Sequence, residues 1–500
     1  MRIEQSSRST QTAQAALLVG MALGLALCYR AGVLSPVYIR QISMTGLSLF
    51  GLLAIARLDM ALLLVPLTAP LFGIPLVLPN GRGGTWSFQL HELALLAIIG
   101  AAAVRAAWWL ARERRMPRWQ QHATMQTVWT YAPHVLLLLL ACVSVLFVVD
   151  RGQALRELRW FIVEPLLFYA LLRCTAAERW ALQGLIVGGA VAGFFALLQA
   201  AGIDLVPLVF GFKATGGFTD NTVTDAGLAR ATSVYQHPNN LGLALERIWP
   251  VAAAMTAWAW LHAPRRTVTT ALYALAALLC LGGIAVSVSR GAWLASGVAA
   301  VVLLLPLIQQ RLGRRAVPAL IGVAVGLALL AVLALTVRGS ITGGSTSVRL
   351  LLWREAVQYI AMRPLGLGMG QFYFYHNPAF GRSLIDPALL GTSEQFVSHP
   401  HNLVLDIWLQ LGPLGLVAFG WLLVRFFHHA RVALVTMRGT QRWFVALGAT
   451  AAMVAALLHG MVDTFYFVSD LAIYFWLLLA LVETVNIRRE ATLASTTKLS

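Results

Sequence analysis

The chain has 500 residues, of which 59% are hydrophobic and only 11% are charged, and its mean hydropathy is +0.75. This composition excludes an ordinary soluble globular protein, because no soluble core requires so much apolar sequence. The formal net charge is +17, but the basic residues fall between apolar runs and form no single face, so the charge does not indicate a nucleic-acid-binding domain.

Apolar runs recur along the chain from its N-terminal part onward. The first, Ala15–Cys28, leads into Tyr29-Arg30 without the small residues of a cleavage site, so we expect a retained anchor and no cleaved signal. Later runs are long enough to cross a hydrocarbon core of about 30 Å: His134–Val149, Trp180–Gly202, Ala316–Val337 and Leu403–Phe427. The pattern predicts an all-α polytopic membrane protein with about 12 to 14 transmembrane helices.

Basic clusters between the runs predict the orientation. Under the positive-inside rule, three of the clusters that mark cytoplasmic segments are Arg112–Arg118, Arg311–Arg315 and Arg425–Arg442. We expect a cytoplasmic N-terminus over 1–14, one transmembrane domain over 15–487 and a cytoplasmic tail over 488–500. The segments expected outside are Asn80–His91, Ile203–Gln236 and the large loop Arg338–Asn402, which hold most of the candidate polar residues.

The large outer loop contains three predicted features. Val348–Met362 has the pattern of an amphipathic helix lying over the membrane surface, with an apolar stripe formed by Leu350, Trp353, Val357 and Ile360. The glycines between Gly366 and Gly370 fit neither a P-loop nor a Rossmann turn. The aromatic run Tyr373–His376 suits packing on lipid headgroups, or less commonly stacking on a sugar.

Several motifs of other enzyme classes are missing from the sequence. It contains no Walker motif, no Asp-x-Asp pair, no Ser-x-x-Lys and no His-Glu-x-x-His, so ATP hydrolysis, acyl transfer and metal-dependent proteolysis lack their usual residues. The four cysteines lie in or beside apolar runs without disulfide or zinc spacing. We therefore expect no cofactor and no metal ion.

Two histidines stand where the outer loop meets a membrane helix. His399 and His401 lie two residues apart, with Asn402 directly before the apolar run from Leu403. An imidazole titrates near neutrality and can accept a proton from a substrate. The alternative is interfacial packing and a helix start. His237, before Pro238, repeats this arrangement at the mouth of another expected span and has the same alternative.

Basic and acidic residues within or beside apolar runs are further candidates. Arg290 is either a snorkelling turn residue or part of an anion site, and Arg349 is either solvated or held by Trp353 to offer paired donors to a diphosphate. Arg230 lies near the end of the expected outer segment Ile203–Gln236. Glu164 lies within an apolar run, where a carboxylate needs a partner, so a structural pairing role comes first.

Together these elements resemble the O-antigen ligase and polymerase superfamily, whose members move lipid-linked glycans on the outer face of the bacterial cytoplasmic membrane. The resemblance runs from about Leu155 onward. Its pieces, in chain order, are Leu155–Arg159 leading to Glu164-Pro165, His237-Pro238-Asn239, Ser289-Arg290-Gly291, Arg349 and Trp353, Pro364 with the following glycines, and His401-Asn402 running into Leu411–Gly415.

The resemblance implies a mechanism and a set of partners. Arg290 and Arg349 would hold the diphosphate of an undecaprenyl-diphosphate-linked glycan, and His401 would deprotonate the acceptor hydroxyl for an inverting transfer. Carboxylates in the outer loops are few and lack Asp-x-Asp spacing, which predicts that the transfer is metal-independent. Arg230, His237, His399 and Asn402 would help to bind the substrate. The implied partners are the lipid-linked donor, a lipid or glycan acceptor and the membrane. His399 duplicates His401, which leaves two candidates for the base.

Members of this superfamily include ligases, polymerases and protein-modifying transferases, which share these motifs. A transporter or flippase of a lipid-linked glycan is the main alternative from another class. Transporters commonly place ionisable residues near the midplane of two related halves. In this chain the candidates gather at the outer ends of the predicted spans and no related halves are visible, which favours the enzyme.

Overall fold

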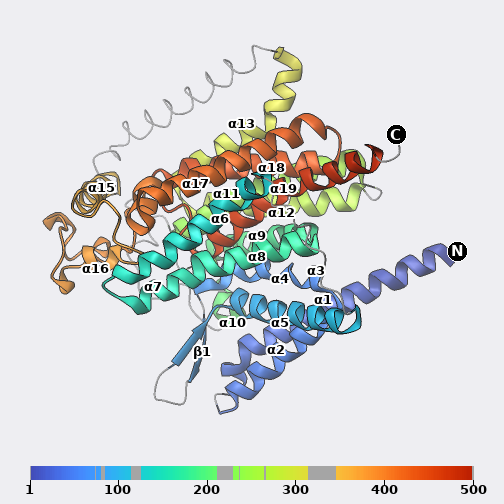
Figure 1. Ribbon diagram of the computed structural model, residues 1–500, viewed down its shortest axis with the longest axis horizontal. Helices are drawn as coiled ribbons and strands as arrows, with labels where there is room; N and C mark the ends of the chain where they lie inside the picture. Colours follow the sequence, from blue (N-terminus) through green and yellow to red (C-terminus); the bar gives the residue numbers. More distant parts are fainter. Residues whose placement is uncertain are drawn as a thin grey trace.

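A computed structural model describes residues 2–35, 37–73, 75–79, 85–113, 125–210, 229–235, 237–263, 266–313 and 345–497. These residues form a bundle of helices with one small hairpin (Figure 1). The longer helices are α1 (Arg2–Leu34), α2 (Ile39–Ala56), α5 (Leu90–Glu113), α6 (Met125–Ser144), α8 (Glu164–Thr175), α9 (Glu178–Ala200), α11 (Pro238–His262), α12 (Arg266–Ser287), α13 (Arg290–Leu312), α15 (Ser345–Met362), α17 (Leu403–Thr436), α18 (Gln441–Gly460) and α19 (Ser469–Thr497).

Shorter elements connect these helices. The short α-helices are α3 (Leu58–Ala61), α4 (Leu64–Thr68), α7 (Arg151–Glu157), α10 (Val206–Phe210) and α16 (Phe372–His376). Single turns of 3-10 helix are η1 (Ala69–Gly73), η2 (Val145–Phe147), η6 (Pro378–Phe380), η7 (Pro387–Leu389) and η8 (Ser393–Phe396), and η3 (Leu158–Val163) is a π-helical turn. The strands β1 (Leu76–Pro79) and β2 (Thr85–Phe88) pair antiparallel.

The all-α membrane fold predicted from the sequence is confirmed. Among the described residues, 8 helices are long and apolar enough to cross a membrane: α2, α5, α9, α12, α17 and α18 and segments of α1 and α6. Two shorter apolar stretches, Leu58–Gly73 and Arg290–Pro306, accompany them. This is fewer than the 12 to 14 expected, but the expected span Ala316–Val337 lies outside the described residues.

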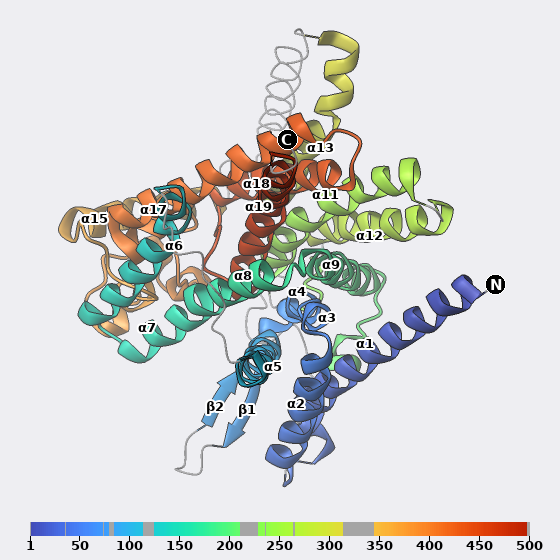
Figure 2. The same cartoon turned by 45° about the vertical axis from the view of Figure 1, so that its right-hand side comes forward.

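The bundle is arranged around α11 and α19. Helix α11 packs against α9, α12, α13 and α18, while α1 and α2 lie side by side at one edge, next to α5 and the hairpin (Figure 2). Close approach of α9 to α12 requires a glycine, because a Cβ at Gly193 would collide with the backbone carbonyl of Leu279. The N- and C-terminal ends lie on the side of the bundle opposite α15 and α16 (Figure 1).

Several acidic and basic side chains form ion pairs inside the bundle. Glu164 is 5% exposed in its side chain and lies 3.3 Å from Nε of Arg159, which also reaches Glu92 at 3.1 Å. Arg425 pairs with Glu483 at 2.7 Å, with both side chains buried. The pairing role expected for Glu164 is therefore confirmed, as burial of an unpaired charge would be costly.

The part of the expected outer loop that the structure describes, 345–402, folds as a small unit with its own core, which we call the outer unit, and it corrects one of the sequence-based expectations. The buried face of α15 carries Leu352, Ala356 and Tyr359, whereas Leu350 and Val357 of the predicted stripe are 57% and 53% exposed. An exposed apolar stripe is compatible with a helix lying over the membrane surface, which stays a prediction. A polar residue, Glu355, completes the inward face of α15. His376 is fully buried and so does not pack on headgroups.

The glycines after α15 bring the outer unit onto α17. Gly366, Gly368 and Gly370 all have positive φ, at 91°, 98° and 67°, and the backbone N–H groups of Leu367 and Gly368 donate to the carbonyl of Leu409. The chain of α17 is broken nearby, at Gly412, where φ is 71°. These glycines have a structural use, consistent with the absence of a nucleotide-binding pattern.

Candidate functional site

A cavity of about 320 Å³ lies where α15, the segment 393–401, the start of α11 and the 460–468 loop meet. Its polar lining combines cationic, imidazole, amide, hydroxyl and carboxyl groups from segments far apart in the sequence: Arg230, His237, Asn239, Asn240, Arg349, Ser393, Glu394, Ser398, His399, His401 and Asp463. Convergent polar groups of this kind in one cavity are typical of a binding or catalytic site.

The backbone around His401 is held by a helix cap. Asn402 is the N-cap of α17, and its side-chain oxygen accepts from the backbone N–H groups of Val404 and Leu405 at 3.0 and 3.1 Å. Its amide donates to the carbonyl of Met461 at 2.9 Å. His401 itself has φ of 52°, a left-handed conformation that is uncommon outside glycine. Trp353 donates to its carbonyl at 3.2 Å, which ties α15 to this turn.

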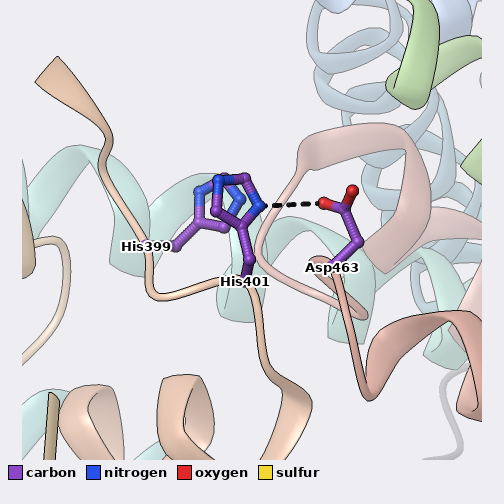
Figure 3. Close-up of side chains that lie close together, drawn as sticks. All are labelled: His399, His401 and Asp463. Carbon is purple, nitrogen blue, oxygen red and sulfur yellow. Dashed lines mark hydrogen bonds and ion pairs between the residues drawn. The ribbon is translucent and has the colours of Figure 1, made fainter. Parts of the chain in front are cut away.

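Asp463 is the acceptor shared by the groups around the cavity. Its side chain is 3% exposed, and its Oδ1 lies 3.2 Å from Nδ1 of His401 (Figure 3). Its Oδ2 accepts from Asn239 at 3.1 Å and lies 3.5 Å from the guanidinium of Arg349. One carboxylate thus connects α11, α15 and the segment before α17.

Electrostatics keep Asp463 ionised. Burial by itself would raise its pKa, but the hydrogen bond and charge of His401, together with the charges of His459 and Arg349, hold the pKa well below its usual value. A carboxylate can only accept, so Nδ1 of His401 carries the proton in this hydrogen bond. In the neutral imidazole, the Nε2 of His401 is then the basic nitrogen.

Arginines form the cationic side of the site. Arg230 donates to Asn239 Oδ1 at 2.7 Å and to the carbonyl of Ser287 at 3.0 Å. Burial and then the charge of Arg290 lower the pKa of Arg230, so the two guanidiniums are close enough to repel each other. Arg290 begins α13 after its N-cap Ser289 and is exposed. An arrangement of like charges is stabilised when an anion binds between them.

Glycine at position 291 allows this corner of the site to pack. A Cβ at Gly291 would collide with the imidazole of His459, whose Nδ1 lies 2.7 Å from Glu246 Oε2 in the buried interior. His459 stands four positions before Asp463, at the end of α18. The Ser-Arg-Gly element therefore packs α13 against the end of α18, four residues before Asp463 in the chain.

The other two histidines of the cavity are weak bases. His237 is the N-cap of α11 and accepts from the N–H of Asn239 at 3.1 Å through Nδ1; burial lowers its pKa to about 4. Burial, and then the charge of His401, lower the pKa of His399 to about 3. The rings of His399 and His401 lie edge to face, with centroids 4.4 Å apart.

His399, His401 and Asp463 also offer the one group of potential metal ligands found among the described residues. Their ligand atoms lie within 4.8 Å of one another. Histidine nitrogen and carboxylate oxygen suit Zn²⁺. The nearby guanidiniums of Arg230 and Arg349 oppose a divalent cation and favour an anion at this place, and we retain the expectation that the protein needs no metal ion.

The structure brings together most of the residues that the sequence singled out. Arg230, His237, Arg349, His399 and His401 line the cavity, and Arg290 does not line it, although its charge acts on Arg230. Asn402 does not line it, because its side chain is used in capping α17.

Asp463 was missed by the sequence analysis. It lies in the short turn between α18 and α19, and a carboxylate between two apolar runs is the signal that could have identified it.

Comparison with known proteins supports the same class. Residues 275–420 match the model of the family described as O-antigen ligase, and this stretch contains Arg290, Arg349, His399, His401 and Asn402. The match confirms the resemblance to the O-antigen ligase and polymerase superfamily in this part of the chain. A search of curated proteins found no match. The protein is thus a multi-pass membrane protein with a region similar to O-antigen ligases, and the match supports glycan transfer in general.

The lowered pKa of His399 predicts an acid-dependent loss of stability. The unfolded chain takes up a proton at this residue below about pH 6.5, whereas the folded protein stays neutral there down to about pH 3, so folding becomes less favourable as the pH falls through this window. Asp463 opposes the effect, while His401, His237 and Arg349 reinforce it.

We expect the thermal unfolding temperature in detergent to fall between pH 7.5 and pH 5, and to fall less in His399→Gln. Equal pH dependence of the two proteins would show that His399 is not held in its neutral form by the fold.

Proposed function

We propose that this protein transfers a glycan from an undecaprenyl-diphosphate-linked donor to an acceptor hydroxyl at the outer face of the bacterial cytoplasmic membrane. The observation that supports this most directly is the pairing of His401 with the buried carboxylate of Asp463, at 3.2 Å, beside the arginines of one cavity. A base held in one tautomer next to an anion site meets the chemical needs of a transfer with a diphosphate leaving group.

In the proposed reaction the acceptor oxygen attacks the anomeric carbon from the side opposite the diphosphate. The new C–O bond forms as the bond from that carbon to the diphosphate oxygen breaks, and its electron pair leaves with the diphosphate. Nε2 of His401 takes the acceptor proton, and Asp463 stabilises the resulting imidazolium. The configuration at the anomeric carbon inverts.

Arg290 and Arg349 are proposed to stabilise the charge that builds on the leaving diphosphate. They approach from different elements, α13 and α15, and Arg230 lies near both, because the charges of Arg290 and Arg349 both act on it. Arg230, His237 and His399 would bind the donor or acceptor, and Asn402 would position His401 by capping α17.

A transporter of lipid-linked glycan remains the alternative from another class. The cavity with its histidines and arginines lies next to the ends of α11, α13 and α17 and not midway along them, which supports the transferase over a midplane transport site.

His401→Ala should lower transfer of the lipid-linked glycan by about 10²–10⁴, the range for loss of a general base. Asp463→Asn should cause a smaller loss, because the imidazole remains but its tautomer and imidazolium form lose their support. Initial rates with purified protein and donor would measure both, with folding checked by gel filtration. Full activity in His401→Ala together with inactivity in His399→Ala would move the role of base to His399.

Replacement of Arg290 or Arg349 by Lys should raise the KM for the donor and lower kcat/KM by about tenfold or more, because the charge remains but the paired donors are lost. Arg354→Lys is the matched control, since Arg354 lies on α15 with an exposed side chain. Wild-type kinetics in both site variants would contradict a shared diphosphate site.

Orientation can be tested by thiol labelling in a background without the four native cysteines. Ala388 is exposed in the outer unit and Thr440 is exposed in the turn between α17 and α18. A cysteine at 388 should react with a membrane-impermeant reagent in spheroplasts, and one at 440 only after the membrane is opened. The opposite pattern would place the site in the cytoplasm and contradict the proposed reaction.

A further inference from the structure

The outer unit contains a fully buried histidine, His376, which does not line the cavity. His376 ends α16 and has no exposed side-chain surface, and its Nδ1 lies 2.8 Å from Oε2 of Glu355, which is 2% exposed. Its Nε2 lies 2.8 Å from the backbone carbonyl of Glu394. The ring of Phe372 stacks on the imidazole at 5.3 Å between centroids. Both nitrogens are therefore engaged in a site closed to water.

The partners of His376 determine its hydrogen atoms. A backbone carbonyl can only accept, so Nε2 carries a hydrogen. The Glu355–His376 pair shares one further proton: either the imidazole is cationic and donates to an ionised Glu355, or a protonated Glu355 donates to Nδ1. In both forms the pair is neutral as a unit and each hydrogen bond is satisfied. Removal of either side chain leaves the other buried without its partner, at a large cost.

His376 of α16 is hydrogen-bonded to two segments, α15 and η8, and both of these segments contribute residues to the cavity lining. Glu355 lies on α15, which also carries Arg349 and the Trp353 that donates to the His401 carbonyl. Glu394 lies in η8, within the wall that runs through Ser398 to His399. His376 thus links the helix of the proposed diphosphate-binding arginine to the wall that carries the histidines, in addition to the hydrogen bond from Trp353 to His401.

We propose that Glu355 and His376 are positioning residues for the transfer reaction, which fix Arg349 relative to the 393–401 wall through a buried hydrogen-bonded bridge. This inference rests on the proposed function. The pair does not touch the cavity, so it acts through Arg349, Glu394 and the segment leading to His401. A displacement of about 1 Å in a group far from the reacting atoms is enough to cost about 10²-fold in rate.

Two substitutions of Glu355 distinguish a positioning role from a role as acid or base. Glu355→Gln keeps the shape and can donate its amide N–H to Nδ1 of a neutral His376, while Nε2–H still donates to the Glu394 carbonyl. Glu355→Ala removes the partner altogether. If Glu355 instead served as an acid or base, the glutamine would fail as badly as the alanine.

The test measures kcat/KM for the lipid-linked donor and backbone hydrogen exchange over 393–401 in the full-length protein. Glu355→Ala and His376→Ala should lower kcat/KM by about 10²-fold, mainly through KM, whereas Glu355→Gln should stay within about threefold of the wild type. Exchange over 393–401 should accelerate in the two alanine variants and not in Glu355→Gln. His428→Ala, which removes an exposed imidazole from α17, is the control and should match the wild type in both measurements.

The two measurements separate the possible failures. Unchanged exchange in folded Glu355→Ala and His376→Ala, or equal losses in Glu355→Gln and Glu355→Ala, would overturn the positioning role. Faster exchange in the alanine variants of a protein that shows no glycan transfer would support the bridge and contradict the proposed function instead.

Discussion

The site depends on one buried carboxylate. Asp463 is 3% exposed and accepts from groups that belong to α11, α15 and the segment before α17. A carboxylate at this depth is tolerated only if several donors compensate for its lost hydration. The donors stabilise the buried carboxylate, and the carboxylate in turn holds each donor in place. The placement of His401 and Arg349 in one cavity therefore follows from satisfying a single buried charge.

Further buried hydrogen bonds join the segments next to Asp463. Glu246 and His459 form a buried pair at 2.7 Å, and Arg247 donates to the carbonyl of Phe465 at 2.9 Å, just after Asp463 in the chain. These contacts join α11 to the end of α18 and to the following turn. Gly291 permits the approach of α13 to His459. A network with most of its members paired is rigid, and rigidity at its outer end is what a base with a fixed tautomer requires.

Sequence patterns predicted the helical membrane fold and most of the cavity residues, because apolar runs and polar residues at their ends are local signals. Asp463 escaped because its partners are distant in the chain: His401 is 62 positions away and Asn239 is 224. The inward face of α15 was not predicted, for a related reason. Its inward side contains Glu355, which is hydrogen-bonded to His376 twenty-one positions later, and apolar periodicity carries no information about such a pair.

The structure also supplies a physical reason to prefer one of the two neighbouring histidines as the base. Burial lowers the pKa of His399 to about 3, so this ring is a poor proton acceptor near neutrality. Its Nε2 has no hydrogen-bond partner among the described protein groups, and no carboxylate is hydrogen-bonded to this ring in the same part of the structure. His401 has Asp463 at its Nδ1, which fixes the tautomer with Nε2 as the acceptor and stabilises the positive charge that forms after proton transfer. The carboxylate, more than the histidine motif itself, therefore distinguishes the proposed base, His401, from its neighbour His399.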